Sequence, residues 1–424
     1  MTSVTAALAR LQVRLARLVA RLLLPRGSYA PVTALADVQR IVVLKLDELG
    51  DVVLVTPFLR ELRRAAPRAH VTVVAQAAAA DLLARSPYVD AVLVHRTTCR
   101  RALRPFVLPW RAAVLGYRRL RPLDPQLALV PRWDGDYWYA TFAALLSGAP
   151  ARVGFAERAT PRKRVVNAGY DALLTRVVEG GPLVHEADRS LDLLRALGAM
   201  PVAGEPEVWW EEAEERFARE AIGHAAADAA SPPVVALCPS FGHSRLKQWP
   251  ADHFVAIGRR LLAAGARVVL VGGPGDRALA GELRAALGDE PTDLTGRTTV
   301  PQLAALLARC ALFVGADTGV LHVATAAGTP AVGLYGPTNV ARFGARRARL
   351  ATLDLPCSPV HRAPELDRCA PCVLGEPRCM LDLGVEQVWR EIARALPGAA
   401  PATAPGGTAD GRRGAAEAPR APLP

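Results

Sequence analysis

The chain has 424 residues, of which 51% are hydrophobic and 22% charged, so its composition is that of a globular protein of about two domains. Lys and Arg number 52 against 40 Asp and Glu, and the resulting net charge of +12 favours anionic partners. Seven cysteines in so long a chain do not indicate a secreted disulfide scaffold, and no apolar run reaches the roughly 18 residues that a transmembrane helix needs.

Residues 1–30 predict a basic amphipathic helix. Leucines recur at spacings of three and four, which places them on one helical face, and arginines accompany them. These residues are Leu8, Leu11, Leu15, Leu18 and Leu22, with Arg10, Arg14, Arg17, Arg21 and Arg26. The arginines interrupt the apolar core that a signal peptide needs. We interpret the segment as an interfacial helix on an anionic membrane surface, with a helix packed on its own domain or a frayed extension as alternatives.

Residues 40–200 alternate between short apolar runs and helical patterns. The predicted strands cover residues 41–46, 71–75, 91–94, 126–131 and 152–155, and residues 156–185 are expected to form loops. Such alternation predicts a parallel sheet with helices on both faces, in which ligands bind at the carboxyl ends of the strands. Asp47, Glu48 and Asp51 follow the first strand and are candidates for proton abstraction, although helix capping or solvation is the expected role of at least two.

Residues 91–123 carry eight arginines and no acidic residue, with aromatic side chains interleaved. The residues are Arg96, Arg100, Arg101, Arg104, Arg111, Arg118, Arg119 and Arg121, with Phe106, Trp110 and Tyr117. This composition suits a membrane-facing surface or a phosphorylated glycolipid, and RNA binding or a solvated basic face are the alternatives. Because no recognised nucleic-acid motif accompanies it, we expect a lipid or phosphate partner and no nucleic acid.

Residues 206–396 repeat the strand–helix theme. A buried strand at 234–238 leads into a loop at 239–250, where a cation such as Lys247 can neutralise a leaving diphosphate. A solvent-exposed basic loop is the alternative. The strand at 267–271 is followed by glycines up to Asp276, which let the backbone approach a ligand closely.

Residues 311–338 read as strand, small-residue turn, helix and strand. Asp317 or Thr318 can cap the helix, and the free N–H groups at its start can hold a phosphate. Asp317 can instead accept a hydrogen bond from a ribose hydroxyl. The alternative for the whole segment is an ordinary βαβ unit with a capped helix and no ligand. The spacing is not G-x-G-x-x-G and the chain has no G-x-x-x-x-G-K-[ST], so a Rossmann dinucleotide site or a P-loop is not supported.

Three ordered segments, KLDELGDVVLVTPFLRELRR, CPSFGHSRLKQWPADHF and GADTGVLHVATAAGTPAVGLYGPT, resemble signatures of glycosyltransferase family 9, the heptosyltransferase family. HEADRSLDLLRALG is also similar to this family, and the likeness runs from about Arg40 to Leu396. It implies an α/β architecture of the GT-B type, with two Rossmann-like, doubly wound parallel-sheet domains facing a cleft. Residues 40–200 would bind the acceptor and 206–396 the nucleotide sugar.

The resemblance implies an inverting, metal-independent sugar transfer that requires no cofactor. Asp51 would deprotonate the acceptor hydroxyl, and Lys247 would offset charge on the departing diphosphate. The donor-binding set is Ser240, Asp276, Asp317, Thr318, Gly319 and Thr338, and the acceptor-binding set is Glu48, Arg132 and Asp136. Many family members carry small polar residues in place of Asp47 and Glu48, which leaves the choice of acceptor open.

The implied donor is a nucleotide sugar, ADP-heptose, and the implied acceptor is a lipopolysaccharide core or another glycolipid or phosphorylated surface glycan. A different nucleotide sugar, or a nucleotide-binding protein without turnover, are the alternatives. We expect the protein in the bacterial cytoplasm, peripheral on the inner membrane.

Four cysteines near the C-terminus have the spacing C-x11-C-x2-C-x6-C, namely Cys357, Cys369, Cys372 and Cys379. Four thiols with one C-x-x-C pair can close a structural zinc site, and reduced thiols or redox chemistry are the alternatives. Residues 397–424 are rich in Pro, Ala and Gly and are predicted to be disordered.

Overall fold

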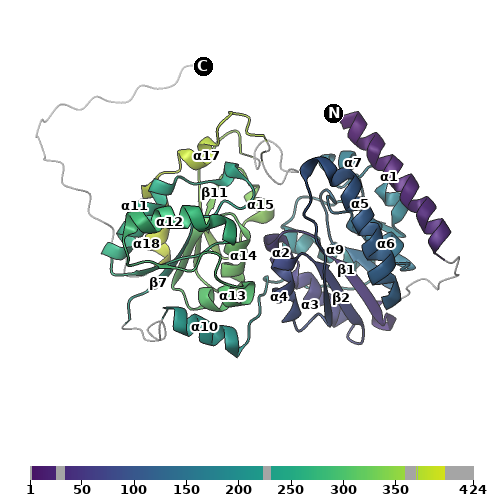
Figure 1. Ribbon diagram of the computed structural model, residues 1–424, viewed down its shortest axis with the longest axis horizontal. Helices are drawn as coiled ribbons and strands as arrows, with labels where there is room; N and C mark the ends of the chain where they lie inside the picture. The colour runs from purple at the N-terminus through teal and green to yellow at the C-terminus, as the bar shows by residue number, and fades with distance from the viewer. Residues whose placement is uncertain (1, 25–33, 223–230, 359–368, 370, 397–424) are drawn as a thin grey trace, which may run out of the picture.

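Two α/β domains lie side by side in the protein, whose structure is a computed structural model describing residues 2–24, 34–222, 231–358, 369 and 371–396 (Figure 1). The first domain contains a six-stranded parallel sheet in the order β3-β2-β1-β4-β5-β6. Its strands are β1 (Arg40–Leu44), β2 (His70–Ala75), β3 (Ala91–Val94), β4 (Leu127–Val130), β5 (Ala151–Phe155) and β6 (Arg176–Val178).

The second domain repeats this topology with the order β12-β11-β10-β7-β8-β9. Its strands are β7 (Val234–Cys238), β8 (Arg267–Leu270), β9 (Thr292–Asp293), β10 (Leu312–Ala316), β11 (Ala331–Tyr335) and β12 (Ala348–Thr352). Each sheet therefore has the Rossmann strand order, in which the chain reverses its direction of travel between the two central strands. The predicted fold class is confirmed.

Helices cover both faces of each sheet. In the first domain they are α1 (Thr2–Leu23), α2 (Leu49–Leu54), α3 (Thr56–Ala65), α4 (Ala77–Ala84), α5 (Arg104–Val114), α6 (Ala140–Leu146), α7 (Pro161–Val166), α8 (Glu186–Arg189) and α9 (Leu191–Ala196). In the second they are α10 (Glu212–Ile222), α11 (Ala251–Ala263), α12 (Arg277–Leu287), α13 (Val300–Ala308), α14 (Gly319–Ala326), α15 (Val340–Phe343), α17 (Arg378–Leu381) and α18 (Val385–Ala395).

The alternating faces of the strands explain this arrangement. In β1, Ile41 and Val43 belong to one buried apolar cluster, whereas Val42 and Leu44 belong to the cluster on the opposite face. A strand that is apolar on both faces needs cover on both sides, and the crossover helices of parallel strands supply it.

The segment 156–185 is not the loop that its weak pattern predicts, because it carries α7 and β6. The Thr160 hydroxyl accepts a hydrogen bond from the Lys163 N–H (3.0 Å), and Pro161 occupies the first turn, so local capping starts α7. β6 is a three-residue edge strand, too short and too exposed to show an alternating apolar pattern.

Helix α1 packs on its own domain through small side chains. Ala9, Val13, Ala16 and Ala20 are buried, and the last three belong to the apolar cluster that includes α6 residues. None of the helices in the described parts of the chain has both the length and the apolar character needed to cross a bilayer. The predicted disorder of 397–424 lies outside the described residues.

The two domains share an apolar interface. Val53 of α2 and Leu82 of α4 belong to the same buried cluster as residues of α13 and α14. The connecting segment is held on the first domain, because the Glu207 N–H donates to the Thr56 hydroxyl (2.8 Å) and the Tyr88 hydroxyl donates to the Glu207 carboxylate (2.8 Å).

Candidate active site

The functional candidates gather where each sheet reverses direction. In the first domain Asp47 follows β1 and Arg132 follows β4, its neighbour in the sheet. In the second, Ser240 follows β7 and Asp317 follows β10. The carboxyl ends of the two central strands flank the crevice in which ligands bind in sheets of this kind.

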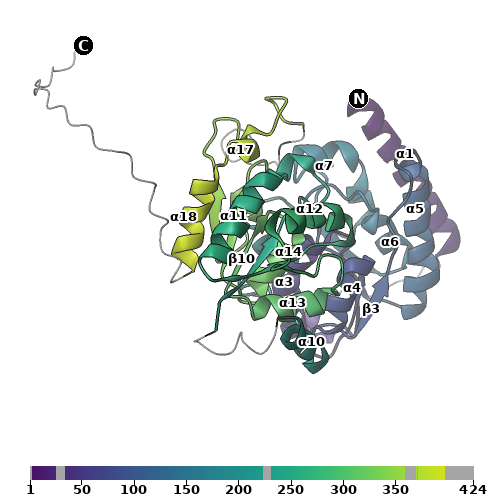
Figure 2. The ribbon, with the colours of Figure 1, turned by 60° about the vertical axis from the view of Figure 1, so that its left-hand side comes forward.

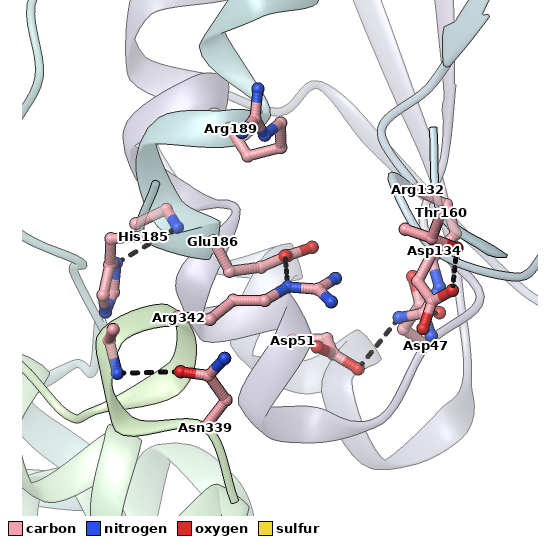
Figure 3. A network of polar contacts seen from close by, with 12 residues as sticks. Asp47, Asp51, Arg132, Asp134, Thr160, His185, Glu186, Arg189, Asn339 and Arg342 are labelled. Atoms are coloured by element: carbon pink, nitrogen blue, oxygen red, sulfur yellow. Dashed lines mark hydrogen bonds and ion pairs between the residues drawn. The ribbon is translucent and has the colours of Figure 1, made fainter. Parts of the chain in front are cut away.

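A buried ion cluster holds Asp47 in the first domain. Lys45 Nζ lies 2.9 Å from Asp47 Oδ2 and Arg132 Nη1 lies 3.0 Å from Asp47 Oδ1. Figure 3 shows Asp47 beside Arg132. Burial alone raises the pKa of Asp47, but Arg132 and Lys45 outweigh it, so the pKa lies below its usual value. Asp47 therefore stays charged and fixes the two cations, which suits a positioning role better than proton abstraction.

Asp51 lies in the first turn of α2 and remains 22% exposed at its side chain. Arg132 Nη1 is 3.4 Å from its Oδ2. Burial raises the pKa of Asp51, Arg132 opposes the rise, and the neighbouring carboxylate of Asp47 adds to it. A reachable carboxylate with a raised pKa is suited to accept a proton from a hydroxyl.

Lys163 supports this cluster from α7. Its Nζ donates to the backbone carbonyl of Arg132 (2.8 Å), and burial lowers the pKa of Lys163 to about 8. The α7 helix thus connects the ion cluster to α1, against which it packs.

The second domain presents an ammonium–carboxylate pair. Lys247 Nζ lies 2.6 Å from Asp317 Oδ2 and 3.1 Å from the Asp317 carbonyl, while the Thr338 hydroxyl donates to the same Oδ2 (2.6 Å). Burial works against ionisation of Asp317, but Lys247 and His322 lower its pKa well below the usual range. Asp317 is therefore a fixed anion that orients the Lys247 ammonium at the end of β10.

The other predicted donor residues surround this pair to different extents. Ser240 is buried and accepts from the Gly242 N–H (3.2 Å), and Thr318 directly precedes α14 as its N-cap. Asp276 follows the neighbouring strand β8, but its carboxylate accepts from the Gly273 N–H (2.8 Å) and so stabilises its own turn. The donor-binding roles of all these residues remain predictions.

The N-termini of α2 and α14 meet across the domain interface. A Cβ atom at Gly50 would lie 3.0 Å from His322 Cδ2, and one at Gly319 would lie 3.1 Å from the Gly50 nitrogen. Only glycine permits this approach without displacement. Asp51 follows Gly50 in α2, and His322, which Gly50 approaches, has its Nε2 3.7 Å from Asp317 Oδ1.

The predicted acceptor residues do not all meet. Arg132 joins the cluster. Glu48 occupies the N-cap position of α2 without a capping hydrogen bond from its side chain, and its Oε1 lies 3.9 Å from His243 Nε2 of the other domain. Asp136 is buried and accepts hydrogen bonds from the Ala140 N–H (3.0 Å) and the Thr141 N–H (2.9 Å), so it caps α6. An acceptor contact by Asp136 would compete with this cap.

The sequence of this chain is similar to those of known proteins. Residues 136–369, more than half of the chain, match the sequence model of glycosyltransferase family 9 (heptosyltransferase). The chain belongs to glycosyltransferase family 9. Lipopolysaccharide heptosyltransferase 2 of Escherichia coli K12 is 27% identical over 71% of this chain and 83% of its own length.

Two solved structures share the fold of this family 9 glycosyltransferase. The glycosyl transferase family 9 protein of Veillonella parvula has a TM-score of 0.68 at 22% identity, covering 86% of this chain and 99% of its own. ADP-heptose lps heptosyltransferase II of E. coli has a TM-score of 0.63 at 23% identity, covering 84% and 98%. The predicted family and the two-domain GT-B architecture are confirmed.

Sequence reasoning missed a buried ion pair that joins the domains of the glycosyltransferase. Arg342 Nε of α15 donates to Glu186 Oε2 of α8 (3.0 Å; Figure 3). The Arg342 guanidinium also lies 4.3 Å from the ring centroid of Trp133. His185 Nε2 lies 2.8 Å from the Gly344 carbonyl. The segment HEADRSLDLLRALG contains Glu186, but no local pattern marks Arg342 as its partner.

The four C-terminal cysteines line one small cavity together with residues such as Leu246 and Pro337. Burial, with the neighbouring thiols adding to it, raises the pKa of Cys379 to about 11. Within the described residues no group of three or more His, Cys, Asp or Glu side chains is arranged to hold a metal ion. The structural zinc remains a prediction.

Proposed function

We propose that this family 9 protein is an inverting heptosyltransferase that moves a heptose from ADP-heptose to a lipopolysaccharide-core acceptor. The observation that carries the proposal is the meeting of α2 and α14 at Gly50 and Gly319, because Asp51 lies in the first turn of α2 and Asp317, paired with Lys247, lies two residues before α14. Each half of the reaction then has its group, a base on the first domain and a cation on the second.

In this mechanism Asp51 accepts the proton of the acceptor hydroxyl as its oxygen attacks the anomeric carbon. The bond from that carbon to the diphosphate oxygen breaks on the opposite face, and the electron pair leaves with the nucleotide diphosphate. A single displacement of this kind inverts the anomeric configuration. Arg132, 3.4 Å from Asp51, orients the carboxylate and stabilises its charged form before the proton is transferred.

Lys247 and the start of α14 act on the leaving group. The ammonium has three N–H donors, two of which are directed to the Asp317 carboxylate and carbonyl, and the third is assigned to a phosphate oxygen. The free N–H groups at Thr318 and Gly319 add the positive end of the helix dipole. Together they offset the developing charge without a metal ion.

The acceptor half lies beside buried cations. Arg132 contacts Asp51, while Lys45 pairs with Asp47 and Lys163 donates to the Arg132 carbonyl. The positive charge gathered there suits an acceptor that carries phosphate or carboxylate groups. A lipid-linked acceptor of this kind implies work at a membrane, and we place the protein in the cytoplasm, peripheral on the inner membrane.

The proposal is tested by supplying purified protein with ADP-heptose and lipopolysaccharide core that lacks its outer heptose. We expect release of ADP and a core heavier by one heptose, with inverted anomeric configuration. Parallel reactions with ADP-glucose, UDP-glucose and GDP-mannose test for another donor. Turnover of one of these in place of ADP-heptose would reassign the donor, and retention of anomeric configuration would contradict the single displacement.

A further inference from the structure

Helix α1 turns its largest apolar side chains away from the protein. Leu11, Leu15 and Leu18 are each 53% exposed and Leu22 is 75% exposed. Their spacings of four, three and four place them on one face of the helix, which we name the leucine stripe. The buried face lies on the opposite side and consists of Ala9, Val13, Ala16 and Ala20. A helix that only needed to pack on its domain would place the leucines inward.

Polar contacts hold α1 in this orientation. The Gln12 side chain donates to the Pro105 carbonyl at the start of α5 (2.6 Å), and Arg121 donates to the Leu23 carbonyl (3.2 Å). Because these contacts, at the middle and the end of the helix, fix its rotation, the exposure of the leucine stripe is built into the fold. A contiguous exposed apolar surface marks a docking site.

Helix α5 extends this surface with aromatic side chains. Leu103, Phe106 and Trp110 recur at spacings of three and four, and Phe106 and Trp110 are 69% and 70% exposed. Figures 1 and 2 show α5 beside α1, on the side of the first domain that faces away from the second. Tryptophan and phenylalanine at such positions are typical of the interface between lipid headgroups and acyl chains.

The charge of α1, and of residues 91–123 that contain α5, has one sign. The four arginines of α1, Arg10, Arg14, Arg17 and Arg21, form no ion pair with any residue that the structure describes, and the same holds for Arg100, Arg104, Arg118 and Arg119. Residues 2–23 and 91–123 contain no Asp or Glu. Guanidinium groups without a neutralising carboxylate can bind anionic groups at a surface, and the exposed leucines beside them can enter an apolar layer below those groups.

We infer that α1 and α5 form a docking surface for an anionic phospholipid bilayer, with the leucine stripe and the α5 aromatics inserted and the arginines on the headgroups. A second copy of this chain fits less well, because pairing two such surfaces would bring unneutralised arginines together. Nucleic acid also fits less well, because aliphatic leucines provide no stacking surface for bases.

The docking surface is one helix away from the ion cluster. α1 packs against α7, and Lys163 of α7 donates to the Arg132 carbonyl beside Asp51. This part of the inference rests on the proposed function: a lipid-linked acceptor anchored in the same bilayer would present its sugar to the first domain without leaving the membrane.

The test is co-sedimentation of the full chain with vesicles of phosphatidylglycerol and phosphatidylethanolamine, compared with phosphatidylcholine alone. We expect binding to the anionic vesicles that weakens with salt, and at least about ten-fold weaker binding for the variant L11Q/L15Q/L18Q. Replacing Arg10, Arg14, Arg17 and Arg21 by Gln should remove the salt dependence together with the binding. Glutamine keeps helix propensity, and circular dichroism checks that each variant is folded.

The matched control is M200S/V202S, which removes two other exposed apolar side chains, 87% and 62% exposed, from the segment between the domains. It should bind vesicles like the unaltered chain. Unchanged vesicle binding of L11Q/L15Q/L18Q would overturn the inference. It would also be overturned if no form of the protein bound vesicles and the unaltered chain formed a concentration-dependent dimer that this variant abolished. The rate of sugar transfer to a delipidated acceptor should be the same for all variants. This assay tests the proposed reaction independently of vesicle binding.

Discussion

Arg132 Nη1 lies 3.4 Å from Asp51 Oδ2 in the protein, and the same nitrogen is 3.0 Å from Asp47 Oδ1. One guanidinium therefore links the carboxylate that stays charged to the one whose pKa is raised. Because Asp47 is also held by Lys45, Arg132 is the cation that most directly controls the protonation of Asp51.

Removing Arg132 should move the acid limb of the activity profile. Arg132 lowers the pKa of Asp51 against the effect of burial, so in Arg132→Met that pKa should rise further. Proton acceptance then needs a higher pH, and we expect the acid limb of kcat/KM to shift upward by on the order of one pH unit. Arg158→Met, which loses an exposed ion pair with Glu179, is the control and should leave the profile in place.

The buried Glu186–Arg342 pair should contribute to the stability of the closed interface. Arg342→Met leaves Glu186 buried without its cation, which should lower the free energy of unfolding by about 3–5 kcal/mol. Adding Glu186→Gln removes the orphaned charge and should recover part of the loss. Chemical denaturation measures both, with Arg347→Met as the control because its contact with Glu205 is exposed and 3.9 Å long.

The same pair predicts a pH dependence. Burial raises the pKa of Glu186, but Arg342 and other cations outweigh it and lower the pKa below its ordinary value of 4.5. The pair thus stabilises the fold above pH 4.5, and this stability is lost as the pH falls through the lowered pKa. The Arg342→Met variant should lose less stability on acidification; an equal loss would assign the acid sensitivity to other carboxylates.

Gly319→Ala should separate the two halves of the site. The new Cβ would lie 3.1 Å from the Gly50 nitrogen and from Leu49 Cβ, so α2 and α14 must move apart. A displacement approaching 1 Å between base and leaving group should slow transfer about 10²-fold. Gly281→Ala in α12 meets no atom within 4 Å and is the matched control. Full activity of Gly319→Ala would show that the close approach is dispensable.

The cysteine cavity gives a prediction about metal. If Cys357, Cys369, Cys372 and Cys379 close a zinc site, purified protein should contain about one zinc per chain, and chelation should lower its melting temperature. Cys369→Ser should lose the metal, whereas Cys99→Ser, outside the cavity, should keep it. A zinc content near zero, together with reaction of all four cavity cysteines with a thiol reagent, would show that these cysteines are free thiols.

The candidate site residues that lie within continuous segments could be predicted from the sequence. Asp51 follows β1 of the first sheet, whereas Lys247 and Asp317 follow β7 and β10 of the second, and each parallel sheet brings the carboxyl ends of its own strands to one edge. Arg342, which pairs with a residue 156 positions away, could not be predicted, because no local pattern encodes that contact. The periodicity of α1 likewise predicted that its leucines share one face, but it did not predict whether that face is buried or exposed to solvent.

The role of Asp51 as the base of an inverting sugar transfer is tested most directly by measuring the turnover of Asp51→Asn together with its affinity for ADP-heptose. We expect turnover to fall roughly 10²–10⁴-fold with donor affinity nearly unchanged, because the amide cannot accept the proton while the Lys247 side of the site is intact. Asp81→Asn, an exposed carboxylate of the same domain, should behave like the unaltered protein. Transfer by Asp51→Asn at the unaltered rate would contradict the account.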